Sequence, residues 1–158
     1  MKKKHPDKRM PLMSWDISNP AYGLRTKKME ELQALVQLSE LNGWQVNLKE
    51  ELAVGYEALV LTGFDQVILW VNQGFQAMTG YSSKFALGKR PSFLQGDKTS
   101  IKAKSRIQKN LSMGKRLTEN ITNYRSNGEE YICQISIIPL FNSNQNITHF
   151  LALETEVR

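Results

Sequence analysis

Cysteine and histidine are scarce in this chain of 158 residues, which has one cysteine, Cys133, and two histidines, His5 and His149. A single cysteine forms no intramolecular disulfide, and these three residues cannot complete the usual zinc site without carboxylates. Haem takes an axial ligand that is usually histidine. His5 lies in an irregular segment, and we expect His149, in a predicted strand near a turn, at the surface. We therefore expect neither a metal site nor haem.

Long apolar runs are also missing, since no stretch approaches the roughly 18 consecutive apolar residues of a membrane helix. No apolar run follows the basic residues at the start of the chain, so no secretory signal is predicted. We expect a cytoplasmic protein without a membrane partner. The chain has no Gly-rich phosphate loop, no Gly-x-Ser-x-Gly and no His-Glu-x-x-His, and no segment typical of a histidine kinase, a nucleotide cyclase or a helix-turn-helix protein. We therefore predict that it is not an enzyme.

The positive charge is concentrated at one end of the chain. Residues 1–28 hold eight Lys or Arg and two Asp, which gives 8 − 2 = +6, the net charge of the whole chain. Residues 29–158 hold 13 basic and 13 acidic residues and sum to zero. A basic arm can bind nucleic acid, but chain ends are usually loose, and a solubilising tail is the simpler interpretation. We do not expect nucleic acid as a partner.

Helical periodicity begins after an irregular basic arm, which we assign to residues 1–25. Residues 26–42 are predicted to form a helix, with Thr26 as its N-cap and Asn42-Gly43 as its stop signal. A connector with a short helical turn completes the region 26–55.

Residues 56–158 alternate between strand and helix signals. Short helices follow the first two strands, Thr99 is the expected cap of a longer helix, and Asn127-Gly128 marks a tight hairpin. The predicted strands cover residues 58–62, 67–71, 118–125, 130–141 and 147–157, and the predicted helices residues 72–79 and 100–113, with a second short helix ending at residue 87. This order predicts an α+β fold, a five-stranded antiparallel sheet with helices on one face and an additional N-terminal helix.

Four short strings in this region carry a resemblance to a known family. They are Ile68-Leu-Trp-Val-Asn72, Phe75-Gln-Ala-Met-Thr-Gly-Tyr81, Gly88-Lys-Arg-Pro-Ser-Phe-Leu-Gln-Gly96 and Asn123-Tyr-Arg-Ser-Asn-Gly-Glu-Glu-Tyr131. In this order and at this spacing they resemble the PAS family of signal-sensing domains, as found in stand-alone bacterial sensor-box proteins. The resemblance implies a PAS domain over residues 56–158.

The loop Gly88–Gly96 is similar to that of the flavin-binding, light-sensing LOV branch of the family, which reads Gly-x-Asn-Cys-Arg-Phe-Leu-Gln. Its last three positions match. Arg90, Pro91 and Ser92 stand at the positions of the Asn, the reactive Cys and the Arg that holds the flavin phosphate. A thiol adduct needs a sulfur at position 91, so we do not expect a covalent flavin photoadduct. The sequence identifies no other cofactor.

The resemblance also indicates which strand residues face inward. Asn123 matches a flavin-contacting Asn, Cys133 stands at the position of its partner, and Glu154 stands at the position of a Gln that hydrogen-bonds the flavin ring. Strand residues two apart share a face. The candidates for a ligand pocket are these inward strand residues together with the apolar residues of the helix that they face. They are Ile101, Ile107, Leu111, Ile121, Asn123, Cys133, Ile135, Ala152 and Glu154. A filled core without a ligand is the alternative.

The opposite face of the sheet is predicted to be apolar and to need a cover, because a solvent-facing sheet should be more polar. The helix over residues 26–42, from the same chain or from a second copy, is the expected cover. The candidates for this interface are Met29, Leu32, Val36, Ile132, Ile138, Leu151 and Leu153. We expect a homodimer, and the sequence does not decide between the two arrangements.

These observations predict a cytoplasmic signal-sensing or adaptor domain. It would bind a small ligand or a protein partner and relay the signal through its sheet face and N-terminal helix. The output would pass to another protein, such as a kinase or a transcription regulator. A structural homodimerisation module without a ligand and a nucleic-acid binder that uses the basic arm remain the two alternatives.

Overall fold

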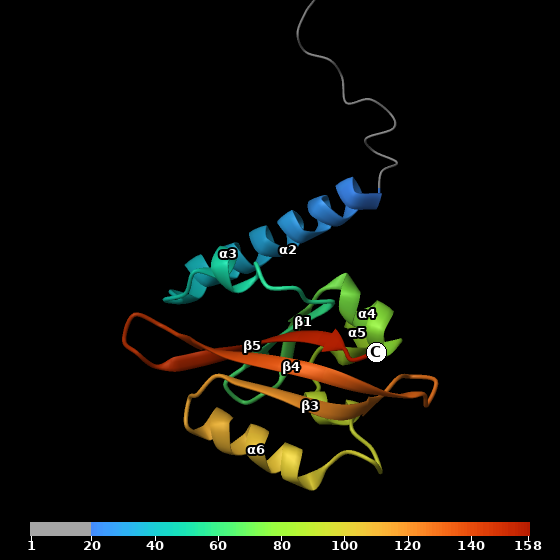
Figure 1. Cartoon of the computed structure of the whole chain (residues 1–158). Coiled ribbons are helices and arrows are strands. Elements are labelled where there is room, and N and C mark those ends of the chain that lie inside the picture. The colour runs from blue at the N-terminus through green and yellow to red at the C-terminus, as the bar shows by residue number, and fades with distance from the viewer. Residues whose placement is uncertain (1–19) are drawn as a thin grey trace, which may run out of the picture.

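A five-stranded antiparallel sheet forms the centre of the computed structural model, which describes residues 20–158 (Figure 1). Its strands are β1 (Ala58–Gly63), β2 (Ile68–Val71), β3 (Leu117–Tyr124), β4 (Glu130–Phe141) and β5 (Ile147–Glu156), in the spatial order β2-β1-β5-β4-β3. The last strand of the chain therefore lies at the centre of the sheet, between β1 and β4. Its residues take part in both cores of the domain.

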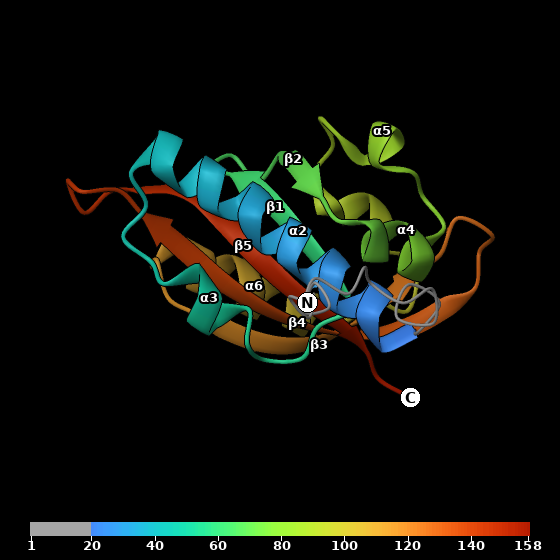
Figure 2. The same cartoon turned by 90° about the horizontal axis from the view of Figure 1, so that it is seen from above.

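Helices cover both faces of this sheet. The helical elements are α2 (Pro20–Asn42), α3 (Leu48–Glu51), α4 (Gln73–Thr79), α5 (Ser83–Ala86), the 3₁₀ helix η1 (Pro91–Leu94) and α6 (Ile101–Ser112). One core lies between the sheet and the insert from α4 to α6, and the other lies between the sheet and α2 with α3 (Figures 1 and 2). The predicted α+β fold, with its five-stranded antiparallel sheet and extra N-terminal helix, is confirmed.

Side-chain caps define the helices of the insert. Asn72 accepts a hydrogen bond from the backbone N–H of Phe75 and begins α4, and Gly80, in the left-handed conformation at φ +77°, ends it. The predicted cap of the long helix is wrong by one residue, because Ser100 caps α6. The Thr99 hydroxyl instead donates to the carbonyl of Thr122 at 2.6 Å and fastens the preceding loop to β3.

Helix α2 begins at Pro20, six residues before the predicted start. Proline suits the first turn of a helix because its missing N–H has no partner there in any case. Thr26 is not the N-cap, since its hydroxyl donates to the carbonyl of Tyr22 one turn earlier, inside the helix. The predicted irregular arm over residues 1–25 is therefore wrong for residues 20–25, and residues 1–19 lie outside the described part of the chain.

The second half of α2 lies across the outer face of the sheet of its own chain (Figure 2). Leu35 is completely buried there, with Leu32 and Leu38 beside it. Three of the four predicted sheet residues lie buried in this core: Ile138, Leu151 and Leu153. The fourth, Ile132, is 47% exposed and does not belong to this core.

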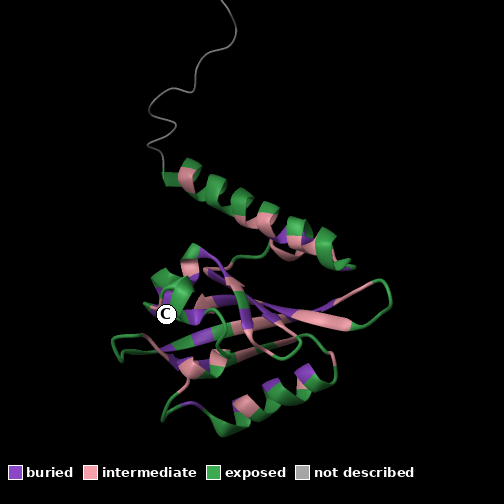
Figure 3. Cartoon of the chain, turned by 180° about the vertical axis from the view of Figure 1, so that it is seen from behind, coloured by how far each residue is buried: buried purple, intermediate pink, exposed green. Residues whose placement is uncertain are grey.

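Two of the three predicted contact residues of this helix point away from the sheet. Met29 and Val36 are 56% and 37% exposed. Residues 29, 32 and 36 and residues 32, 35 and 38 both fit one helical face in the sequence, and the packing against the sheet selects the second set. From Pro20 to Glu30 no residue of α2 is buried (Figure 3).

Candidate functional site: a cavity between the sheet and the helical insert

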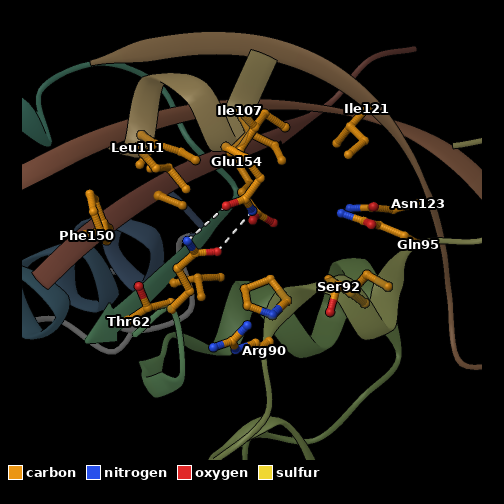
Figure 4. Close-up of a pocket in the computed structure, with 18 residues that line it drawn as sticks. Thr62, Arg90, Ser92, Gln95, Ile107, Leu111, Ile121, Asn123, Phe150 and Glu154 are labelled. Atoms are coloured by element: carbon orange, nitrogen blue, oxygen red, sulfur yellow. Dashed lines mark hydrogen bonds between the residues drawn. The ribbon is translucent and has the colours of Figure 1, made fainter. Parts of the chain in front are cut away.

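A cavity of about 200 Å³ lies between the inner face of the sheet and the insert formed by η1 and α6 (Figure 4). Seven of the nine predicted pocket residues line it: Ile107, Leu111, Ile121, Asn123, Ile135, Ala152 and Glu154. Most of its wall is apolar. A cavity of this size is smaller than the roughly 300–1,000 Å³ of pockets that hold drug-sized ligands. It has room for a molecule of one or two rings.

Two predicted pocket residues lie elsewhere. Ile101 is the first residue of α6, where it is 82% exposed, because the cavity is reached only by the later turns that carry Ile107 and Leu111. Cys133 is completely buried and lies in the core behind the cavity. Its short side chain contacts Glu154 and does not reach the cavity. The alternation of strand residues predicted correctly that Cys133 faces inward, but it could not show that the side chain does not reach the cavity.

Most of the polar lining comes from residues that the sequence did not single out as pocket candidates. They are Thr62, Gln66, Arg90, Ser92, Gln95 and Gln108. The alignment of Arg90, Ser92 and Gln95 with the flavin-binding loop was the available signal for three of them. Gln66, in the β1–β2 turn, and Gln108, on α6, exchange two amide hydrogen bonds of 3.1 Å, which the dashed lines in Figure 4 mark. This pair ties the turn to the helix at the edge of the cavity.

Glu154 is the unusual member of the lining. It is only 4% exposed, on the central strand β5, and its Oε2 accepts a weak hydrogen bond from the Cys133 thiol at 3.8 Å. No other side-chain partner reaches this carboxyl among residues 20–158. Burial raises the pKa of Glu154 to about 7, because the charged form loses its hydration. Burial and the nearby Glu154 charge also raise the pKa of the Cys133 thiol. The cavity thus holds a carboxyl poised to change charge near neutral pH.

Two further polar groups lie at one end of this site. The Asn123 amide is 3% exposed and lines the cavity next to Gln95 (Figure 4). Behind it, the Tyr131 hydroxyl is buried and has no hydrogen-bond partner of normal geometry in the described chain. Burial raises the pKa of Tyr131, and the neighbouring Asn123 amide lowers it in part. This end of the cavity therefore has unused hydrogen-bonding capacity.

The lining does not fit the covalent chemistry of flavin photoreceptors. Pro91 lines the cavity at the position of the reactive cysteine, and the lining residues include no thiol. Ser92 replaces the Arg that holds the flavin phosphate. A thiol adduct with a flavin in this cavity therefore has no sulfur to form it.

A hydrogen-bonded joint connects this core to α2. The Asn72 side chain accepts from the backbone N–H of Leu59 and Phe75 and donates to Glu31 Oε1 on α2 at 2.9 Å. The Tyr56 hydroxyl donates to the other oxygen of Glu31 at 2.7 Å. Both Glu31 oxygens thus accept hydrogen bonds, one from Tyr56 just before β1 and the other from Asn72 just before α4. Nothing in the sequence placed Glu31 beside Asn72.

His149, which was predicted to lie at the surface, is half-buried against Trp44. The two ring centroids are 5.0 Å apart, and Trp44 Nε1 donates to His149 Nδ1 at 3.2 Å. Burial lowers the pKa of His149. Within residues 20–158 no three His, Cys, Asp or Glu side chains are grouped as metal ligands would be. No helix in this range is long and apolar enough to span a membrane.

The sequence pattern of the PAS domain family matches residues 57–158, which form the sheet and its helical insert. This chain belongs to the PAS domain family. The PAS domain is a sensory domain, so the resemblance to this family and the sensory character of the domain are confirmed. The match does not include α2 or the connector that follows it, although α2 and α3 cover the outer face of the sheet.

The relatives of this PAS domain include light sensors. It is 31% identical over 93 residues to blue-light-activated histidine kinase 2 of Erythrobacter litoralis, covering 59% of this chain and 27% of the kinase. It is 30% identical over 90 residues to a blue-light photoreceptor of Listeria innocua, covering 57% of this chain and 35% of the photoreceptor. The chain thus spans about a third or less of these two proteins.

Solved structures agree with this placement. The light-state structure of the LOV domain of the blue-light photoreceptor Aureochrome1 superposes with a TM-score of 0.65 at 27% identity, over 71% of this chain and 90% of that one. The PAS domain of the fruit-fly ELK potassium channel superposes with a TM-score of 0.60 at 28% identity, over 64% and 86%. The fold is therefore shared with PAS domains from photoreceptors and from a channel.

Proposed function

We propose that this PAS domain senses a small ligand in the cavity between its sheet and its helical insert, and relays binding through α2 to a partner protein. The observation that carries the proposal is the preformed cavity with Glu154 buried in its wall. A buried carboxyl without a strong partner is costly, and a ligand that bonds to it relieves that cost. A cavity that served only as core would be filled by apolar side chains.

A short chain of hydrogen bonds leads from the cavity to α2. The backbone carbonyl of Glu154 accepts from the N–H of Glu57 at 2.8 Å. The carbonyl of Glu57 accepts from the Asn72 amide, which also donates to Glu31 on α2. A ligand that moves β5 at Glu154 would therefore disturb the joint that holds α2. This route supports α2 as the output element, with a kinase or a transcription regulator as the receiving partner, as in the histidine kinases among its relatives.

The first test is an absorption spectrum and a native mass spectrum of the full chain purified from cells. We expect a retained small molecule of one or two rings and no light-induced thiol adduct. A ligand-free protein, at every protein concentration and after gentle purification, would contradict the sensing function. A bleaching flavin adduct would contradict our interpretation of Pro91.

The same native mass spectrum reports the oligomeric state, for which we propose a homodimer through the outer face of α2. Tyr22, Met29 and Val36 recur every seven residues on this helix and are 38%, 56% and 37% exposed. A seven-residue repeat of apolar side chains is typical of paired helices. This stripe also supports the alternative of a dimerisation module without a ligand, which a ligand-free dimer would favour. Binding of nucleic acid by the basic arm stays an alternative, and a cytoplasmic location stays a prediction.

The joint at Glu31 can be tested directly. Replacing Glu31 with Gln leaves a single acceptor oxygen for the two donors, Tyr56 and Asn72. The new N–H₂ group then faces one of these donors and cannot accept its hydrogen bond. Hydrogen bonds to charged groups contribute about 1.5–3 kcal/mol each, so we expect the amides of α2 to exchange with deuterium about tenfold faster or more. Glu30→Gln, one position away on the exposed side of the helix, is the matched control. Equal exchange in both variants would show that the joint does not hold α2.

A further inference from the structure

The cavity has a defined polar arrangement between two apolar walls. Ile121, Ile135 and Ala152 form the sheet side, and Ile107 and Leu111 face them from α6. Figure 4 shows Glu154 between these walls, with Asn123, Gln95 and Ser92 toward one end of the cavity and Phe150 and Thr62 toward the other. The space between a sheet face and a helix face is a slot, which suits a flat molecule better than a round one.

Glu154 has unused acceptor capacity in this slot. Its Oε2 is shared with the Cys133 thiol at 3.8 Å, and its Oε1 has no hydrogen-bond partner within residues 20–158. A carboxylate has about four acceptor positions on two oxygens and pairs best with two parallel N–H donors. The group that completes this site must therefore donate.

We propose that the cavity binds a small planar nitrogen heterocycle that directs two adjacent N–H donors, as in a 2-amino-substituted ring, at the Glu154 carboxyl. This inference rests on the proposed ligand-binding function. The amides of Asn123 and Gln95 offer both donors and acceptors to the remaining ring atoms. The volume of about 200 Å³ limits the ligand to one or two rings. A three-ring flavin is larger and presents a different set of donors.

A primary ammonium is the competing donor, and the lining disfavours it. An ammonium has three N–H donors, whereas Glu154 can accept two of them, and neither Ile135 beside it in the sheet nor Ile107 on α6 can accept one. The third donor would need an acceptor from the few polar groups at the ends of the slot, and burying it without one is costly. A flat ring instead presents only its edge to Glu154 and buries both faces against the apolar walls.

The charged and titratable groups near Glu154 do not supply the missing donors. Cys133 is a weak donor, Tyr131 lies behind Asn123, and Glu57 is itself acidic. Arg90 lines the same cavity but is exposed and makes no ion pair with a described residue. α6 contributes only apolar and amide side chains to the lining.

The test compares three probes of nearly equal size by isothermal titration calorimetry with the full chain. 2-Aminobenzimidazole has the two adjacent donors, benzimidazole lacks the exocyclic amino group, and benzylamine carries an ammonium. We expect 2-aminobenzimidazole to bind about tenfold more tightly than the other two, because it alone completes the pairing with the carboxyl. If 2-aminobenzimidazole binds no more tightly than benzylamine, the proposed ligand class is wrong.

Two variants connect that difference to the site. Glu154→Gln should bring the affinity for 2-aminobenzimidazole down to that for benzimidazole, and an unchanged preference would overturn the role of Glu154. Ala152→Leu keeps the carboxyl but fills the slot, and it should abolish binding of both ring probes. Circular dichroism checks that each variant is folded.

Failure of this inference can be told apart from failure of the sensing function. If riboflavin or a molecule retained from cells binds and 2-aminobenzimidazole does not, the ligand class is wrong and the sensing function stands. If no probe binds and the purified protein retains no molecule, both are wrong.

Discussion

Replacing Glu154 with Gln should flatten the pH dependence of stability between about pH 5 and pH 8. Burial raises the pKa of Glu154 from 4.5 to about 7. Between these values the folded carboxyl keeps a proton that the unfolded one has lost, so the stability falls as the pH rises through this window and the loss is complete above the folded pKa. Each pH unit costs about 1.4 kcal/mol, which amounts to about 3 kcal/mol in total.

Urea unfolding of both proteins at four pH values measures this difference. The variant should match the wild type near pH 4.5 and exceed it in unfolding free energy by about 3 kcal/mol at pH 8. His149, whose pKa is lowered, removes stability as the pH falls, but it is present in both proteins and cancels in the comparison. Parallel profiles would mean that Glu154 does not titrate in this window. Glu40→Gln, on an exposed position of α2, is a control with little expected effect.

Truncating Leu35 to Ala should cost about 2–5 kcal/mol of unfolding free energy. Leu35 is the only buried residue of α2, and it packs in the outer core with Leu59 and Leu151. Its loss leaves a cavity and weakens the main contact between α2 and the sheet. The expected result is a lower urea midpoint, together with faster proteolytic cleavage within α2.

Leu41→Ala is the matched control for this variant. Leu41 lies on the same helix and is the same residue type but is 83% exposed, so we expect a change within about 0.5 kcal/mol. If both variants behave alike, α2 does not lie on the sheet of its own chain in solution. In that case a second copy becomes the candidate cover of the outer face.

The strands were more predictable from the sequence than the N-terminal helix. The predicted span of residues 130–141 is the observed β4, since the Asn127-Gly128 turn fixes its start and apolar alternation continues to its end. The start of α2 was missed because Pro20 was taken as part of an irregular arm, although proline is common in the first turn of a helix. Sequence periodicity also could not choose between two overlapping apolar stripes on α2, a choice that depends on the tilt of the helix on the sheet.

The cavity was predictable where strands and the middle of α6 form it, and not where loops do. The resemblance set Asn123 as inward, alternation then put Ile135 and Glu154 on the inward faces of their strands, and all three do line the cavity. It could not place Gln66 beside Gln108, which are 42 residues apart in sequence. It also could not show that Ile101 precedes the part of α6 that reaches the cavity. Loop conformation and helix position depend on tertiary packing, which no local pattern encodes.

The exposed first half of α2 has a mechanical consequence. From Leu35 to Pro20 the helix rises about 1.5 Å per residue, so Pro20 lies about 22 Å from the residue that anchors the helix. A tilt of about 10° at that anchor would displace Pro20 by about 4 Å. Glu31 lies close to Leu35, so a small shift of α2 at the Glu31 joint becomes a several-fold larger displacement at Pro20. A partner bound at the N-terminal end of α2 would therefore meet a displacement several times larger than the shift at the Glu31 joint.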